Sequence, residues 1–159
     1  MSDDPLLARI IPVLAAVPGV AAIVLGGSRA RGTAHDASDT DIGLYYRDGA
    51  ALVRRFQWEV LFSIENAELA VPRGDSTHIA GCAYRALACI AQVLFALNGA
   101  YLINEKGALA QAANFPVTVR DLAGRATEVW RQIGAAEHAA TLQMLRVLES
   151  DLQKICRVS

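Results

Sequence analysis

Strand-like sequence is confined to the first third of this chain, and this confinement limits the folds open to it. Residues 20–25 form an unbroken apolar run rich in β-branched side chains, which Gly26 and Gly27 end. Such a run is typical of a strand that is buried on both faces. Residues 39–46 also have strand composition and precede a turn at 47–49. From residue 50 onward the apolar residues recur with the helical period, so we expect a small sheet followed by helices.

Cap residues, prolines and periodicity place the expected helices along the chain. They cover residues 5–17, a short turn within 28–37, and then residues 50–71, 77–97, 106–113, 119–133 and 136–155. Asp75 or Ser76 is expected to cap the helix at 77–97, which is apolar nearly all round and should form the centre of a bundle. The sequence therefore predicts an α+β protein with two strands per chain, divided into a unit of residues 1–48 and a helical bundle of residues 49–159.

The charge balance excludes classes of function that depend on a strong electric field. Lys and Arg together number 15 and Asp and Glu 16, which leaves a net charge of −1 and nothing to attract nucleic acid or anionic lipid at long range. The apolar stretch 86–104 contains polar residues and a glycine, so we interpret it as a buried helix with a turn rather than a membrane span. The N-terminus is acidic and has no secretory pattern, which predicts a cytoplasmic protein.

The thiols give no sign of a bridge or a metal site. Cys82, Cys89 and Cys156 are an odd, widely spaced set, so they are expected to be reduced and structural.

Chemistry-bearing residues gather between positions 26 and 41. Gly26, Gly27 and Ser28 follow the first strand and open a helical turn, where backbone N–H groups and a hydroxyl can approach a phosphate closely. Arg29 and Arg31 lie in the same turn, and the planar guanidinium of either could contact a phosphate. These five residues are therefore the candidates for binding a phosphorylated ligand.

Two carboxylates follow closely in the chain. Asp39 and Asp41 flank Thr40 in the second expected strand, where the period of two would place both side chains on one face. Paired carboxylates repel each other unless a cation lies between them, and their hard oxygen ligands suit Mg²⁺ bound together with substrate phosphates. Asp39 and Asp41 are the candidate metal ligands and catalytic residues.

The combination of Gly27-Ser28 with Asp39-x-Asp41 resembles the DNA polymerase β-like nucleotidyltransferase superfamily. The resemblance implies that the Gly-Ser turn holds the triphosphate of a nucleotide, most simply ATP or another NTP, and that the aspartates ligate Mg²⁺. It also implies transfer of a nucleotide monophosphate to a hydroxyl, with release of pyrophosphate. Residues 62–67, 73–75, 80–82, 85–89, 92–98 and 101–108 are similar to the helical C-terminal part of bacterial proteins with such a domain.

One part of the superfamily pattern is missing from this sequence. The superfamily has a third carboxylate on a later strand, whereas this chain passes from Tyr46 through a turn directly into helices. Within the chain the substitutes are Asp48, Glu59 and Glu65, none of them at a strand position, and another chain could supply the group instead. Because two strands make a poor sheet, we expect a homodimer or a partner protein to cover it.

Two functions stay open at this point. The first is a Mg²⁺-dependent nucleotidyltransferase that acts on a small molecule or a protein, with nucleic acid disfavoured as acceptor because no basic stripe is present. The second is a catalytically degenerate nucleotide-binding or protein-interaction module, such as an antitoxin-like partner. His35 is interpreted as an exposed loop residue, and the Arg73-x4-His78 spacing as incidental because Gly74 and a helix cap interrupt it.

Overall fold

The computed structural model describes residues 5–30, 32–35, 38–46, 49–102 and 104–158. Its contacts divide the chain into two units, Met1–Gly49 with Tyr101–Asn104, and Ala50–Ala100 with Glu105–Ser159. The predicted α+β class is confirmed, since a two-stranded antiparallel sheet is combined with helices that make up most of the chain.

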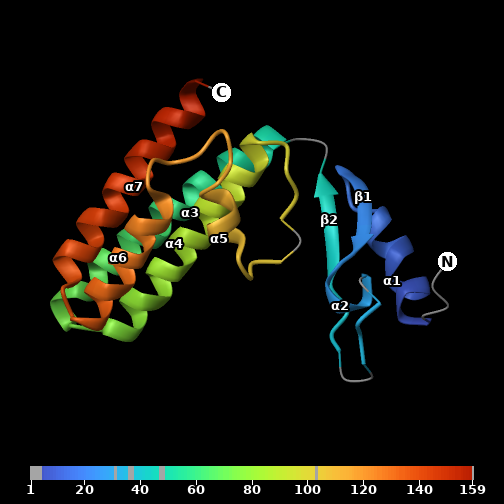
Figure 1. Ribbon diagram of the computed structural model, residues 1–159, viewed down its shortest axis with the longest axis horizontal. Helices are drawn as coiled ribbons and strands as arrows, with labels where there is room; N and C mark the ends of the chain where they lie inside the picture. The colour runs from blue at the N-terminus through green and yellow to red at the C-terminus, as the bar shows by residue number, and fades with distance from the viewer. Residues whose placement is uncertain (1–4, 31, 36–37, 47–48, 103, 159) are drawn as a thin grey trace. The chain divides into compact units, whose positions relative to one another are not determined.

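The first unit contains α1 (Pro5–Ala15), β1 (Val20–Leu25), α2 (Gly27–Ala30) and β2 (Ile42–Tyr46). The two strands lie side by side (Figure 1) and pair antiparallel. Leu25 lies opposite Ile42, and Ile23 lies opposite Leu44. Helix α1 packs on β1 and continues through Pro12, although proline removes one amide donor from the helix. This arrangement brings the end of β1 next to the start of β2.

The prediction that residues 20–25 are buried on both faces is wrong. No side chain of β1 is fully buried within this chain, and Ala21 and Ala22 are exposed. The reason is the size of the sheet, because in the described part of the chain it has two strands and no third strand follows β2. An apolar strand thus remains partly open to solvent.

The second expected strand is shorter than predicted. It begins at Ile42, so Asp39 and Asp41 precede β2 instead of lying within it. Hydrogen bonding between the two strand segments nevertheless extends to Asp41, since the Gly26 amide donates a hydrogen bond of 2.8 Å to the Asp41 carbonyl. The argument that strand alternation places both carboxylates on one face therefore does not apply.

The second unit is helical, as the periodicity predicted. It consists of α3 (Gly49–Ala70), the 3-10 turn η1 (Val71–Arg73), α4 (Ser76–Leu97), α5 (Ala108–Ala112), α6 (Leu122–Gly134) and α7 (His138–Val158). Helix α4 packs against α5, α6 and α7 (Figure 1) and contributes ten buried side chains, which confirms its central place. It is long and apolar enough to cross a membrane, but 56% of its most apolar window is buried inside the helical unit.

The start and the end of α4 are defined by side-chain hydrogen bonds. Gly74 has a φ of 61° and ends η1, and the carboxylate of Asp75 then accepts a hydrogen bond of 3.0 Å from the His78 amide as N-cap. At the other end Asn98 donates to the Leu94 and Val117 carbonyls and accepts from the Val117 amide. The break at Gly74 agrees with our interpretation that Arg73 and His78 are not one motif.

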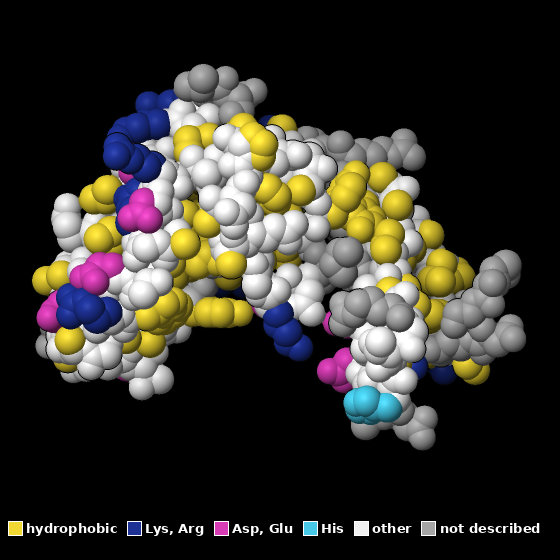
Figure 2. Space-filling model, in the orientation of Figure 1, with side chains coloured by type: hydrophobic (Ala, Val, Ile, Leu, Met, Phe, Trp, Pro, Cys, Tyr) yellow, Lys and Arg dark blue, Asp and Glu magenta, His cyan; other side chains and the backbone are white. Residues whose placement is uncertain are grey.

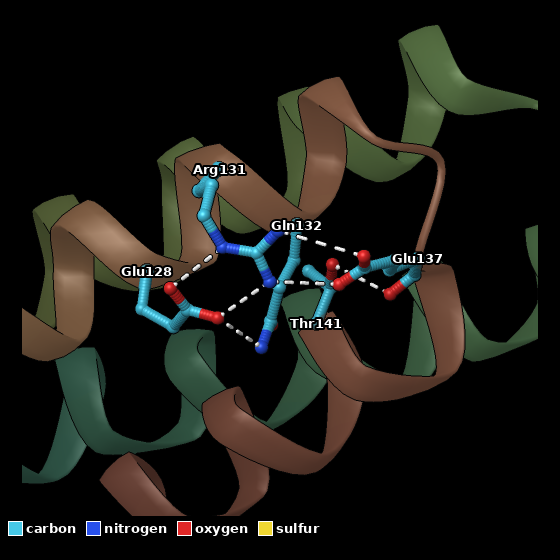
Figure 3. A network of polar contacts seen from close by, with 5 residues as sticks. All are labelled: Glu128, Arg131, Gln132, Glu137 and Thr141. Carbon is cyan, nitrogen blue, oxygen red and sulfur yellow. Dashed lines mark hydrogen bonds and ion pairs between the residues drawn. The ribbon is translucent and has the colours of Figure 1, made fainter.

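Polar contacts close the corner between α6 and α7 in the same unit. The Arg131 guanidinium donates to both Glu128 and Glu137 at 2.8 Å, while Gln132 donates to Glu128 (Figure 3). These carboxylates raise the pKa of Arg131. All three cysteines of the chain are free thiols, as expected, and burial raises the pKa of each.

Candidate nucleotide-binding site

The candidate site begins where β1 passes into α2. Gly26 is buried, and its carbonyl accepts a hydrogen bond from the Ala30 amide while its amide is held by Asp41. Gly27 has a φ of 62°, a left-handed conformation that glycine adopts at little cost. The chain can therefore leave the strand and start a helical turn within one residue.

The carboxylate of Asp41 lies directly against the backbone of Gly27. A Cβ atom at Gly27 would overlap with Oδ2 of Asp41, so only glycine leaves room for this side chain. The predicted phosphate-binding turn and one of the predicted metal ligands are thus in contact. This closeness comes from the pairing of β1 with β2, because the two residues are 14 positions apart.

Neither candidate metal ligand is neutralised by another side chain. Asp39 is exposed and Asp41 half-buried, and within the described ranges neither carboxylate has a hydrogen-bond or ion-pair partner. The Asp41 carboxylate at the glycine turn fits a divalent cation that also binds phosphate oxygens. No group of three or more metal-ligating side chains occurs among the residues that the structure describes.

Arg29 connects the turn to the acidic loop. Its guanidinium donates a hydrogen bond of 2.8 Å to the carbonyl of Ser38, the residue before Asp39. The Nε–H group of Arg29 is buried and has no hydrogen-bond partner among the residues that the structure describes, which is costly unless an acceptor comes close. Arg29 therefore positions the loop and retains one donor suited to an anion. Arg31, the other candidate guanidinium, lies outside the described residues.

Ser28 keeps its hydroxyl available. Its carbonyl accepts hydrogen bonds from the amide and the hydroxyl of Thr33, which close the loop after α2. The hydroxyl itself has no partner in the portion of the chain described, so it could donate to a phosphate oxygen. His35 is exposed, in agreement with its interpretation as a loop residue; its amide donates to the Ser38 hydroxyl and its carbonyl accepts from the Ser38 amide.

The two described candidates for the third carboxylate, Glu59 and Glu65, belong to the helical unit. Glu59 is engaged by Arg85 at 2.8 Å and by Arg55 at 3.9 Å within the helical unit. Glu65 lies exposed on α3 of the same unit, and Asp48 is outside the described residues. In the structure as described, the later strand that carries this group in the superfamily is absent.

The segment Tyr101–Asn104 belongs to the first unit by its contacts, which the sequence did not predict. The ring of Tyr101 packs edge-on against Tyr45 of β2, with 3.9 Å between the ring centroids. No local pattern reports this contact, because it joins residues 56 positions apart.

Comparison with known families agrees with this geometry. Residues 7–77 match the nucleotidyltransferase domain, which confirms the predicted resemblance to polymerase β-like nucleotidyltransferases for this part of the chain. The match begins in α1, includes both strands and the acidic pair, and continues through α3. No curated protein and no solved structure matches the chain. A nucleotidyltransferase domain indicates nucleotidyl transfer from an NTP and, as a rule, a divalent metal ion.

Proposed function

We propose that the first unit transfers a nucleoside monophosphate from a Mg²⁺-bound NTP, most simply ATP, to a hydroxyl of a small molecule or a protein. The observation that carries the proposal is the contact between the Asp41 carboxylate and the Gly27 turn, in a domain that matches the nucleotidyltransferases. Asp41 thus offers an anionic ligand for a metal next to the phosphate donors of the turn, and Asp39, two residues earlier, is the second proposed ligand.

Each residue has a defined part in this proposal. Gly27 and Ser28 would bind the triphosphate through their amides and the Ser28 hydroxyl, with the buried Nε–H of Arg29 as a further donor. Gly26, predicted as a third binding residue, would instead position the turn, because its amide already donates to the Asp41 carbonyl. Asp39 and Asp41 would hold Mg²⁺, which when bound shields the phosphate charge and makes the acceptor hydroxyl more acidic. The acceptor oxygen bonds to the α-phosphorus, the bond to pyrophosphate breaks, and the hydroxyl proton leaves to water.

Calorimetric titration of ATP with and without Mg²⁺ tests the donor site. We expect Mg²⁺-dependent binding to the wild type and its loss in Asp39→Ala/Asp41→Ala. An Asp75→Asn variant, altered in the helical unit, serves as a control with unchanged binding. Absence of Mg²⁺-dependent binding to the wild type would contradict the proposal, and titration with GTP, CTP and UTP measures the base preference.

The pair of carboxylates favours a second candidate function, a nucleotide-binding or protein-interaction module without turnover. The described residues lack a third acidic ligand next to Asp39 and Asp41, and catalysis in this superfamily uses three. Pyrophosphate release with hydroxyl acceptors separates the two functions. Binding of Mg²⁺-ATP without release would assign the module, whereas release that is lost in Asp41→Ala would assign the transferase.

We also propose that the first unit is covered by a second copy of the chain. Its exposed apolar side chains on α1 include Leu6, Ile11 and Val13, and apolar side chains gather on the visible face of this unit (Figure 2). Both strands are edges of a two-stranded sheet, which is marginal in water by itself. A partner could also contribute the missing carboxylate.

A further inference from the structure

A hollow between α3 and α7 of the helical unit has the lining of a nucleotide site. Its volume is about 400 Å³, and its walls are formed by Gln57, Trp58, Leu61, Gln153, Cys156 and Arg157. All six residues belong to the same contact unit, and none takes part in the candidate site of the first unit. The set contains an indole, two carboxamides and one cation, and it includes no carboxylate.

Trp58 provides a flat surface that remains accessible. Its indole stacks on the ring of Phe62 one helical turn later, with centroids 4.9 Å apart and planes inclined by 16°. Phe62 covers one face of the indole, and Trp58 as a whole is 59% exposed. The second face is therefore available to a planar ligand, and nucleobases stack on aromatic side chains of this kind.

The two carboxamides complement the edge of a base. Gln57 has no hydrogen-bond partner within the described part of the chain, so it can both donate and accept. The amide nitrogen of Gln153 is held by Glu149, which leaves its carbonyl oxygen as an acceptor. Glutamine, like asparagine, can pair with adenine through one donor and one acceptor, and the amino group of adenine would donate to such an acceptor.

Arg157 adds positive charge at the end of α7. Its side chain is exposed and forms no ion pair with the described carboxylates, so its guanidinium can bind a phosphate through two parallel donors. Leu61 and the half-buried thiol of Cys156 supply the apolar part of the lining. The neighbouring hollow between α3 and α4 differs, because there Glu59 and Arg85 already neutralise each other.

We propose that this hollow binds an adenine nucleotide, with the base on Trp58 and the phosphate at Arg157. The ligand chemistry is the same for free AMP and for an adenosine nucleotide within a single-stranded RNA. The site is separate from the metal-dependent site of the first unit and does not depend on the proposed transferase activity.

Fluorescence of Trp58 tests the proposal. The chain has two tryptophans, so Trp130→Phe leaves Trp58 as the sole indole. We expect AMP to quench its emission saturably in the presence of EDTA, and equally in the Asp39→Ala/Asp41→Ala background. Calorimetry on the wild type, which needs no Trp130 substitution, should give the same affinity. Absence of saturable binding by both methods would overturn the proposal.

Variants with matched controls test which residue binds the base and which binds the phosphate. Trp58→Leu should weaken AMP binding about tenfold or more, as expected for loss of one base stack. Tyr84→Leu, which removes a similarly exposed aromatic side chain on α4, should have no effect. Arg157→Gln should weaken AMP about tenfold and leave adenosine unchanged, whereas Lys154→Gln on the same helix should change neither. Equal effects of the hollow variants and their controls would refute the assignment.

A comparison of AMP with tetra-adenylate identifies the source of the nucleotide. Tighter binding of the tetranucleotide, with the same dependence on Trp58, would indicate an RNA strand. Equal or weaker binding would indicate a free nucleotide.

Discussion

Gly27 and Asp41 determine each other's positions in the candidate site. The glycine adopts a φ that few other residues tolerate, and the carboxylate occupies the space that a Cβ would take. Arg29 strengthens this arrangement by holding Ser38, which precedes the acidic pair. The position of the Asp41 carboxylate therefore depends on a residue that has no side chain.

The substitution Gly27→Ala tests this dependence. We expect it to destabilise the first unit by more than the roughly 1–2 kcal/mol that a left-handed conformation costs an L-residue, because the methyl group also displaces Asp41. Gly32→Ala is the matched control, since Gly32 has a φ of 70° and open space around its Cα. Hydrogen exchange of the first unit and Mg²⁺-ATP titration measure both effects. Equal losses in the two variants would show that the contact with Asp41 has no influence.

Much of this site could be predicted from the sequence, but its contacts could not. The residue types and the spacing of the Gly-Gly-Ser turn and the acidic pair are local, so they are visible in the chain. The contact of Asp41 with Gly27 and the use of Arg29 on Ser38 arise only when β1 and β2 pair. For the same reason, the placement of Asp39 and Asp41 within a strand was a wrong prediction.

At the level of the elements, the start of α4 depends on its N-cap. We expect Asp75→Ala to lower the free energy of unfolding of the helical unit by about 1 kcal/mol, because the His78 amide loses its acceptor. Thr77→Ala in the same turn is the control, and its effect should be near zero or slightly stabilising. Urea denaturation followed by circular dichroism measures both. A cap variant as stable as the control would count against this role.

Helix α3 is connected to its neighbours by ion pairs. Glu68 accepts hydrogen bonds from Arg146 of α7 at 2.6 Å and 2.8 Å, and these bonds lower the pKa of the Glu68 carboxyl below its ordinary value. Both side chains are about one-third exposed, so the pair should contribute about 1 kcal/mol or less.

The Glu68–Arg146 pair predicts a dependence of stability on pH. Because the folded-state pKa is lowered, its stabilisation is fully present above the ordinary carboxyl pKa, about 4.3, and is lost as the pH falls through the folded value. The wild type should therefore be more stable than Glu68→Gln at pH 7, and the difference should shrink below about pH 4. Glu105→Gln should show no such change. Thermal unfolding at several pH values measures the difference, and a constant gap would disprove the linkage.

For the whole molecule, the two units differ in how much apolar surface they bury. The helical unit has a continuous core around α4, whereas in the first unit Leu7 is the buried apolar side chain among the described residues. Burial of apolar area is the main source of stability. The first unit should therefore open at a lower free energy than the helical unit.

Association of two copies of the chain should slow hydrogen exchange in the first unit. We expect its amides to exchange faster than those of α4 in dilute protein and to become protected as the concentration rises, in parallel with dimerisation seen by ultracentrifugation. Val13→Lys on α1 should weaken the association, because Val13 is 68% exposed and apolar, while Val147→Lys on α7 should not. If the protein stays monomeric and its hydrogen exchange does not depend on concentration, a second copy of the chain does not cover the first unit.

The order and type of the elements, the capped central helix and the composition of the candidate site were determined by the sequence alone, because periodicity, caps and turn residues act over a few positions. Tertiary structure decided the rest. It exposed a strand whose apolar sequence predicted full burial, placed Tyr101 beside Tyr45, and brought Asp41 against Gly27. Such features depend on which surfaces meet across long stretches of chain, and no local pattern contains that information.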